Sequence, residues 1–350
     1  NKSRQEMGRN EFLTNVWKWK KQSGDTIINQ LKRLGASCDW ERTAFTMSGA
    51  PGSPAEDDGN FHDAVIKVFV EMYNKGLIYR GKRLVNWDPH FETAISDLEV
   101  ENIEIAGKMW HFKYPLKDNE TYLHIERDSE GNIMKEETRD YISIATTRPE
   151  TMLGDSAVAV NPSDERYKSL VSKNVIVPIV DRKIKIIEDD YADPEQGTGA
   201  VKITPAHDFN DYEVGDRNNL EVINVFTPDG KINENAPDNY IGLDRFEARK
   251  RILKELSDKD LLVKEEKIKN KVPYGDRSNS VIEPYLTEQW FADAKKLSIK
   301  AKKIVKNKKT SFFPKNWSKT YFQWMNNICL LYTSDAADDL LCVDLGGRRI

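Results

Sequence analysis

The sequence predicts an α/β outer domain that is interrupted by an inserted, β-barrel-like α+β domain. Apolar residues recur at helical spacing in residues 10–35 and 62–76, and the apolar period changes to two from about residue 106. An aromatic-rich helical pattern returns in residues 317–325. The expected domains are an outer domain at 1–105 and 272–328 and an insert at 106–271.

Length and composition are those of a globular protein. The 350 residues suffice for about two domains, and 39% of them are apolar and 31% charged. The net charge of −4 gives no global basic field for nucleic acid, although a local patch would suffice. Lys295–Lys309 is a candidate patch, with a solvated helix face as the alternative.

The sequence carries no signal for a membrane or for an oxidising compartment. No apolar run approaches the ~20 residues of a membrane span, and the N-terminus has no signal-peptide core. The chain does not begin with Met, so we expect it to start inside a longer reading frame. Cys38, Cys329 and Cys342 form no Cys-x-x-Cys pair, which argues against a disulfide framework or a zinc ribbon and favours the cytoplasm.

The first outer segment predicts two helices and one strand. Residues 10–35 are expected to be helical, with Gly35 as the C-terminal cap. The Gly- and Pro-rich residues 49–60 predict a loop. A second helix is expected over 62–76, and a turn with a short strand over 77–87.

Short strands separated by turn residues dominate the insert. The candidates are Lys108–Pro115, Tyr122–Arg127, Tyr141–Thr146, Ser156–Val160, Val175–Val180, Lys183–Glu188, Gly199–Thr204 and Val222–Phe226. Because no regular helices alternate with them, a barrel-like arrangement is favoured over a parallel βαβ sheet.

The remaining elements follow from local patterns. We expect a hairpin at Asp229-Gly230, a helix from about Asp244 to Asp258 with Phe246, Ile252, Leu253 and Leu256 as its buried stripe, a linker or solvated strand at 264–271, a turn-rich loop at Val272–Ser278, and a helix at Trp317–Met325.

Residues 329–350 break with the rest of the chain. The stretch that begins Cys329-Leu-Leu-Tyr-Thr-Ser-Asp corresponds to one translated frame of a common sequencing adapter. We therefore expect this tail not to be native sequence, and a divergent C-terminal tail is the alternative. Two of the three cysteines would then be foreign to the protein.

Polar residues are unusually dense directly after one predicted strand. Gly197–Glu213 opens with two glycines, runs through a short apolar strand, and then places His207, Asp208 and Asp211 within five residues. Ala145–Asp155 is a second polar stretch upstream. We expect the two segments to meet in one pocket.

Both stretches contain strings that resemble the editing domain of the valyl-tRNA synthetase family. The similar strings are Thr146–Asp155 and Gly197–Glu213 for editing, Leu84–Pro89 and Ala94–Glu101 for the passage from the catalytic domain, and Val272–Ser278, Ile282–Pro284, Leu286–Phe291 and Phe313–Trp317 for the return. The resemblance runs from about Gly8 to Ile328. The isoleucyl family has Thr-Pro-Trp-Thr at the place of Arg148–Thr151, and the leucyl family lacks the Lys202–Asp208 pattern.

The sequence departs from that family in four ways. The His-x-Gly-His and Lys-Met-Ser-Lys-Ser strings that handle ATP are not found, and both are expected outside the ends of this chain. The loop at 49–58 is longer than usual. Gln196 stands where many members carry an aromatic residue, beside the expected pocket.

The resemblance implies an incomplete Rossmann-type catalytic domain with an inserted editing domain. The whole enzyme would use ATP and Mg²⁺ to charge tRNA(Val) with valine, act as a cytoplasmic monomer, and have no membrane partner. This portion would hydrolyse mischarged Thr-tRNA(Val), and it would bind neither a cofactor nor a metal. Two alternatives remain: an isoleucyl- or leucyl-type editing domain, and a folded fragment that only binds tRNA. A free-standing hydrolase is disfavoured because the outer segments resemble catalytic-domain pieces.

The candidate site residues have expected roles, of which the resemblance itself implies that of Asp211. Asp211 would anchor the α-ammonium, and Asp208, Thr204 and Lys202 would read the β-hydroxyl and hold water or the terminal ribose. Thr146, Thr147, Arg148 and His207 would complete the substrate-binding pocket.

Each candidate also has a structural alternative. Asp208 and Asp211 could cap a helix that starts near Phe209, Arg148 and Glu150 could form a structural ion pair, and His207 could be a core histidine. A phosphate loop at Gly197–Gly199 lacks the required spacing. A metal site at His207 lacks further ligands.

Overall fold

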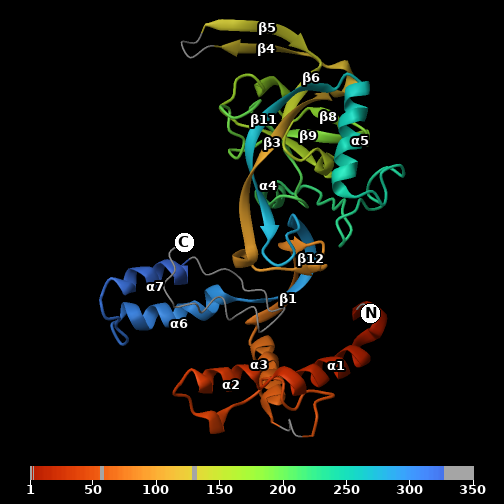
Figure 1. The fold of residues 1–350 in the computed structure, drawn as a ribbon. Coiled ribbons are helices and arrows are strands. Elements are labelled where there is room, and N and C mark those ends of the chain that lie inside the picture. Colours follow the sequence, from red (N-terminus) through yellow and green to blue (C-terminus); the bar gives the residue numbers. More distant parts are fainter. Residues whose placement is uncertain (1, 3, 56–58, 128–131, 327–350) are drawn as a thin grey trace. The chain divides into compact units, whose positions relative to one another are not determined.

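The computed structural model describes residues 2, 4–55, 59–127 and 132–326, so the tail at 329–350 lies outside the described residues. By its contacts the chain divides into two compact units (Figure 1). The first comprises Asn1–Tyr79 and the described residues from Phe291 onward, and the second is Arg80–Trp290.

Helices make up most of the first unit. They are α1 Arg4–Ser23, α2 Thr26–Arg33, α3 Phe61–Asn74, α6 Ala294–Lys306 and α7 Trp317–Asn326. The single helix expected over 10–35 is therefore two helices. They separate at Gly24, where a Cβ would lie 2.5 Å from the carbonyl oxygen of Lys20. Gly35 follows α2 with φ +78°, which confirms the predicted cap.

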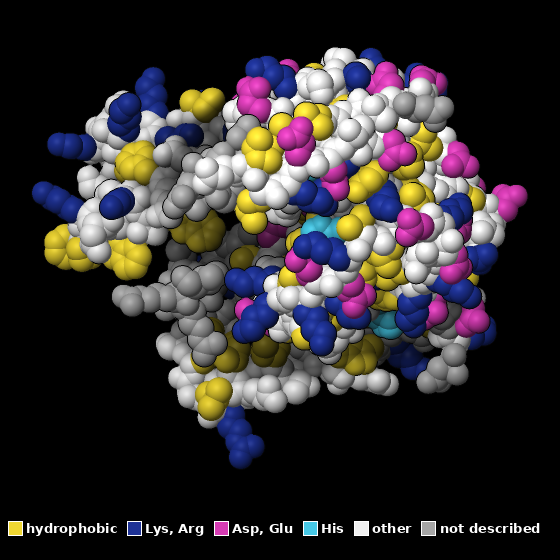
Figure 2. All heavy atoms as spheres, turned by 90° about the horizontal axis from the view of Figure 1, so that it is seen from above, with side chains coloured by type: hydrophobic (Ala, Val, Ile, Leu, Met, Phe, Trp, Pro, Cys, Tyr) yellow, Lys and Arg dark blue, Asp and Glu magenta, His cyan; other side chains and the backbone are white. Residues whose placement is uncertain are grey.

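Apolar faces of these helices remain exposed. Neither α2 nor α3 contains a buried residue, and Val65 and Val68 are 59% and 56% exposed. On α6 most of the lysines face solvent, as in the solvated-helix interpretation of Lys295–Lys309. Cations and acids are interspersed over the face seen in Figure 2. No helix within the described ranges is long and apolar enough to cross a membrane.

Open sheets form the second unit. A four-stranded sheet has the order β10-β7-β9-β8, a three-stranded sheet the order β11-β3-β6, and β4 pairs with β5. The bounds are β3 Val100–Pro115, β4 Tyr122–Arg127, β5 Ile133–Arg139, β6 Tyr141–Thr146, β7 Ala157–Val160, β8 Asn174–Val177, β9 Arg182–Glu188, β10 Ala200–Ile203 and β11 Leu262–Gly275.

The described strands close no barrel, so the barrel-like expectation is wrong in that respect. β3 and β8 belong to different sheets, and they are linked only by an isolated bridge between Leu116, just after β3, and Val175 of β8. A closed barrel would need a continuous ladder of hydrogen bonds there. A fourth open sheet, β12-β1-β2, is formed by β1 Ile78–Asp88, β2 Thr93–Ala94 and β12 Glu283–Ala292. The mixture of helices and strands expected from the sequence is confirmed.

β3 and β11 form one long antiparallel ribbon (Figure 1). Pairing begins at Phe112 with Leu262 and continues to Val100 with Gly275, with one irregularity near Leu262. The segment 264–271 is therefore a strand with solvated side chains, one of the two interpretations offered by its charge. The turn-rich loop predicted from Val272 begins later, since β11 continues to Gly275.

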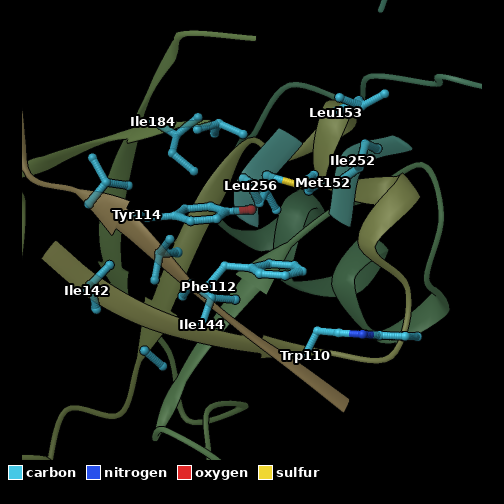
Figure 3. Close-up of a cluster of buried hydrophobic side chains, with 14 of the residues drawn as sticks. Trp110, Phe112, Tyr114, Ile142, Ile144, Met152, Leu153, Ile184, Ile252 and Leu256 are labelled. Atoms are coloured by element: carbon cyan, nitrogen blue, oxygen red, sulfur yellow. The ribbon is translucent and has the colours of Figure 1, made fainter. Parts of the chain in front are cut away.

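The core of this unit lies between the sheets and one helix. Phe112 and Tyr114 from β3 point toward Met152 and Leu256 (Figure 3). Leu256 belongs to α5, Arg245–Asp258, whose predicted stripe is confirmed at this residue and at Ile252. Phe246 is wrong in that stripe, because it is 36% exposed.

The predicted hairpin is confirmed, but the strand predicted before it is not. The hairpin signal is confirmed, since Thr227 N donates to Lys231 O and Gly230 has φ +76°. The predicted strand over Val222–Phe226 is absent from the described chain, where only an isolated bridge to Ile232 forms.

Candidate functional site

The two polar stretches meet where β10 pairs antiparallel with β7. A cavity of about 240 Å³, here called the small cavity, lies beside this pairing. Its lining contains all eight predicted site residues: Thr146, Thr147, Arg148, Lys202, Thr204, His207, Asp208 and Asp211. Met109, Ala145, Thr151, Tyr191 and Val201 complete it. The structure thus brings the candidates together, and their chemical roles stay predictions.

A buried carboxylate organises one wall of the small cavity. Asp155 is fully buried, and its Oδ1 accepts from Thr204 Oγ1 at 2.6 Å and from Lys202 Nζ at 3.2 Å. Its Oδ2 accepts from Tyr114 OH at 2.6 Å. Burial raises the pKa of Asp155, against the opposing influence of Lys202 and the two hydroxyl groups. Asp155 was missed as a site residue, although it ends the first string directly before a buried strand.

Lys202 is saturated by this arrangement. Its Nζ donates to Asp155, to Thr151 Oγ1 at 2.9 Å, and to the hydroxyl of Thr204. An ammonium group has three N–H donors, so none is left for a ligand here. Lys202 therefore orients the Thr204 hydroxyl and supplies positive potential to the small cavity.

The two aspartates take different positions at the start of α4, Phe209–Arg217. Asp208 is the N-cap, and its Oδ1 accepts from Asn210 N at 2.8 Å and Asp211 N at 3.1 Å. This confirms the capping alternative for Asp208 and leaves its second oxygen for a ligand. Asp211 does not cap the helix; its Oδ2 accepts from Thr204 N at 2.8 Å.

Asp211 is titratable near neutral pH. Asp211 is only 5% exposed to solvent. Burial raises its pKa to about 7, while Lys202 opposes the shift and Asp208 adds to it. A carboxylate of this kind gains from a cation that enters the cavity, because the cation replaces lost hydration.

His207 is a buried neutral histidine. Its Nε2 accepts from Val225 N at 3.0 Å, so a neutral ring carries its proton on Nδ1. Burial, with Arg148 and Lys202 nearby, holds its pKa well below the usual range. The ring packs on Phe226 with centroids 4.5 Å apart. The core-histidine alternative is therefore favoured, although Nδ1 is buried without a hydrogen-bond partner among the described residues.

Arg148 reaches across the site. Its Nη1 donates to His207 O at 3.0 Å, its Nη2 pairs with Glu283, and its Nε lies 3.5 Å from Glu150 Oε1. Burial lowers the pKa of Arg148, but Glu283 and Glu150 outweigh it and the net shift is upward. The sequence pointed to Glu150 as a partner and missed Glu283. Thr146 supports the turn, since its Oγ1 accepts from Arg148 N at 3.0 Å.

A second cavity of about 920 Å³, the large cavity, adjoins the small one. The two linings share Thr147, Arg148 and Asp208. Gln196, expected beside the pocket, is exposed and donates to Asp193 at 2.8 Å, and it is not part of either lining. In the described part of the chain, no three His, Cys, Asp or Glu side chains gather as a metal site.

Known proteins match this chain over nearly all of its length. The family model described as tRNA synthetases class I (I, L, M and V) matches residues 1–330. A valine–tRNA ligase of Pelagibacter ubique is 64% identical over 323 residues, which are 92% of this chain and 34% of the relative. A valine–tRNA ligase of Caulobacter vibrioides is 56% identical over 329 residues, 94% of this chain and 35% of the relative.

The chain thus spans about a third of the length of the curated relatives that it matches. Both relatives are named for valine, which places this chain nearer to the valyl members than to the isoleucyl and leucyl alternatives left open by the sequence. The chain therefore belongs to the family of class I tRNA synthetases, and the members that it matches here are valine–tRNA ligases.

Proposed function

We propose that this portion of the chain hydrolyses Thr-tRNA(Val), the mischarged product of a valine–tRNA ligase. The observation that carries the proposal is the small cavity, which gathers a buried carboxylate, hydroxyl groups and cations from two distant segments. The whole enzyme would charge tRNA(Val) with valine, using ATP and Mg²⁺. The two strings that handle ATP are not found in this sequence, and the proposed hydrolysis consumes only water.

Threonine is the expected error of a valine site. The two amino acids are nearly isosteric, so an apolar pocket cannot reject the added hydroxyl strongly, and valyl-tRNA synthetase is itself the standard example of this limit. A second site can exploit the hydroxyl instead. This second site hydrogen-bonds the threonine hydroxyl. Valine has no hydroxyl, so it would leave the polar atoms of the second site unpaired and would bind poorly.

The small cavity offers a group for each part of the substrate. Asp211 has a second carboxylate oxygen beside the one that holds Thr204 N, and it would pair with the α-ammonium. Thr204 Oγ1 donates to Asp155 and accepts from Lys202, which leaves one lone pair to accept the threonine hydroxyl. The free oxygen of Asp208 is a second acceptor for this group or for water.

Hydrolysis needs no covalent nucleophile in this proposal. Aminoacyl esters are labile, and holding a water against the carbonyl supplies much of the rate. The positive potential of Lys202 stabilises negative charge that develops on the carbonyl oxygen. Thr147 and Arg148 would hold the terminal nucleotide, because they lie in the wall shared by both cavities.

The test is hydrolysis of pre-charged Thr-tRNA(Val) by this chain, with Val-tRNA(Val) as the substrate that must be spared. Asp211→Asn keeps an acceptor for Thr204 N and removes only the charge. A lost charge pair in a partly dry site costs about 2–5 kcal/mol, or roughly 30- to several-thousand-fold in kcat/KM.

Asp189→Asn is the matched control. Asp189 is also buried and is paired with Arg217 at 2.5 Å, but it lies outside both linings. Its hydrolysis should equal that of the wild type. Retained hydrolysis in Asp211→Asn would overturn the assignment of the site.

A non-enzymatic function is the competing class. The chain spans only part of its relatives, so binding tRNA without cleavage is the alternative outcome. An unchanged lifetime of Thr-tRNA(Val), together with measurable binding of tRNA(Val), would favour it. Cytoplasmic location and a monomeric state remain part of the proposal; sedimentation of the purified chain would test the latter.

A further inference from the structure

A cluster of five charged side chains, three of them buried and two half-buried, adjoins the small cavity. Arg148 and Glu150 come from the segment that follows β6, Arg245 and Arg249 from α5, and Glu283 from the start of β12 (Figure 1). All five belong to the second unit. They carry three positive and two negative charges, so every carboxylate is shared between guanidinium groups.

The two carboxylates divide their partners unequally. Glu150 is held by Arg249 through two contacts of 2.7 and 2.8 Å, and Arg148 is 3.5 Å away. Glu283 pairs with Arg148 through Oε2 and with Arg245 through Oε1 at 2.9 Å. Glu283 is therefore the main carboxylate partner of Arg148, although 135 positions separate the two residues.

Arg148 faces both cavities, whereas Glu283 lines only the large one. The Arg148 side chain is 29% exposed, and the Glu283 side chain is 4% exposed. Arg148 lines both cavities, while Glu283 is absent from the lining of the small one. Of the two arginines that pair with Glu283, Arg148 is the one that lines the small cavity.

We propose that Glu283 is a positioning residue that fixes Arg148 in the wall shared by the two cavities. This inference rests on the proposed hydrolytic function. Two N–H groups of Arg148 remain after its contacts with Glu283, Glu150 and His207 O, and their direction is set by the planar guanidinium group. Without Glu283, the long side chain keeps only the distant Glu150 and one carbonyl, and its donors no longer point at one place.

Loss of this positioning should appear in substrate binding. Arg148 sits where a bound tRNA end would pass between the cavities, so it contributes to binding in the ground state and transition state alike. Removing such an interaction raises KM and leaves kcat nearly unchanged. A merely structural defect would instead lower the active fraction, which reduces the apparent kcat at an unchanged KM.

The experiment is a double-mutant cycle on the whole 350-residue chain. Glu283→Gln keeps the shape and removes the charge, and Arg148→Ala removes its target. We expect Glu283→Gln to raise KM for Thr-tRNA(Val) about 10- to 100-fold, as for a hydrogen bond to a charged group. In the Arg148→Ala background the same substitution should change KM by less than about threefold, because positioning has nothing left to act on.

The cycle separates Arg148 from the other partner of Glu283. Loss of the Arg245 contact is common to both backgrounds, so it cancels in the comparison. Glu255→Gln is the control: this carboxylate on α5 pairs with Lys259 and Tyr240 and does not reach Arg148. It should leave KM unchanged.

Distinct outcomes separate this inference from the proposed function. An equal rise of KM in both backgrounds, or a fall of kcat alone, overturns the positioning role while hydrolysis stands. No hydrolysis by the wild type overturns the proposed function. In that case the free energies of unfolding of the wild type, the two single variants and the double variant still measure the coupling between Arg148 and Glu283. If the effects of the two substitutions on stability add, the contact between these residues is refuted.

Discussion

The pKa of Asp211 makes the stability of the second unit depend on pH. Burial raises this pKa from its ordinary 3.8 to about 7, so the folded chain binds the proton more tightly than the unfolded chain. The contribution of Asp211 to the free energy of unfolding is then largest below about pH 4, falls as pH rises to about 7, and is level above. Asp211→Asn should abolish this fall while keeping an acceptor for Thr204 N.

The size of the effect follows from the two pKa values. The difference between 3.8 and about 7 corresponds to roughly 4 kcal/mol between the two ends of the range. Asp211 is 5% exposed, so little of this is screened by solvent. Relative to the wild type, Asp211→Asn should therefore gain stability progressively from about pH 4 to pH 7.

Amide hydrogen exchange is the suitable assay, because it reads opening of this unit apart from the rest of the chain. The amides of β10 and β7 report the pairing next to the small cavity. Their exchange is followed between about pH 5 and 8 and corrected for intrinsic rates. Asp189→Asn is the control, since hydrogen bonding from Arg217 lowers the pKa of Asp189, and the contribution of this carboxylate is lost only at lower pH.

The reasoning fails on a clear result. If wild type and Asp211→Asn give parallel curves between about pH 5 and 8, Asp211 does not titrate in that range. A flat curve in Asp189→Asn, which keeps Asp211, would likewise contradict the assignment.

Two further predictions concern activity and the buried wall. The kcat/KM for Thr-tRNA(Val), corrected for uncatalysed hydrolysis, should rise through about pH 7 as Asp211 ionises. It should fall near about pH 8, where the α-amine of the substrate loses its proton. If kcat/KM still rises through about pH 7 in Asp211→Asn, this prediction is contradicted. Asp155→Asn should lower the free energy of unfolding by about 3–5 kcal/mol, since it leaves the Lys202 ammonium without its buried counter-charge. Denaturant unfolding measures that loss, and a change below about 1 kcal/mol would show that the pair is not buried as described.

Local periodicity located most strands of the second unit. The predicted Tyr122–Arg127 and Tyr141–Thr146 coincide with β4 and β6. In β6 the apolar Ile142 and Ile144 alternate with Ser143 along the sequence, and both isoleucines enter the core. β5, Ile133–Arg139, was missed. Its charged side chains do not alternate with apolar ones, and its only partner is another strand of a two-stranded sheet within the described residues.

Val222–Phe226 shows the opposite error. Its β-branched residues satisfy the strand pattern, but side chains, one local and one distant in sequence, occupy its backbone N–H groups. Val225 N donates to the ring of His207, and Phe226 N donates to Asn224 Oδ1 at 3.0 Å. No spacing rule in the sequence reports such a long-range acceptor.

The site residues that lie in the two short strings could be predicted from the sequence, and those that lie elsewhere in the chain could not. All eight predicted residues line the small cavity, because a strand and the turn after it carry their polar groups to one place. Glu283 lies far along the chain, and only the fold places it against Arg148. The assignment of N-cap to Asp208 and of a buried acceptor to Asp211 also required coordinates, since both lie one turn apart at the same helix start.

The ribbon of β3 and β11 has a consequence for how such a segment can be exchanged. Val100 and Gly275 are paired residues, so the two ends of the intervening chain leave it side by side, about 5 Å apart. Closing that gap after excision requires only a tight turn, and the entropy cost of a short closure is small. The segments before Val100 and after Gly275 therefore stay about as far apart whether the chain between them is removed, inserted or replaced. This makes residues 100–275 a segment that could be exchanged as a unit.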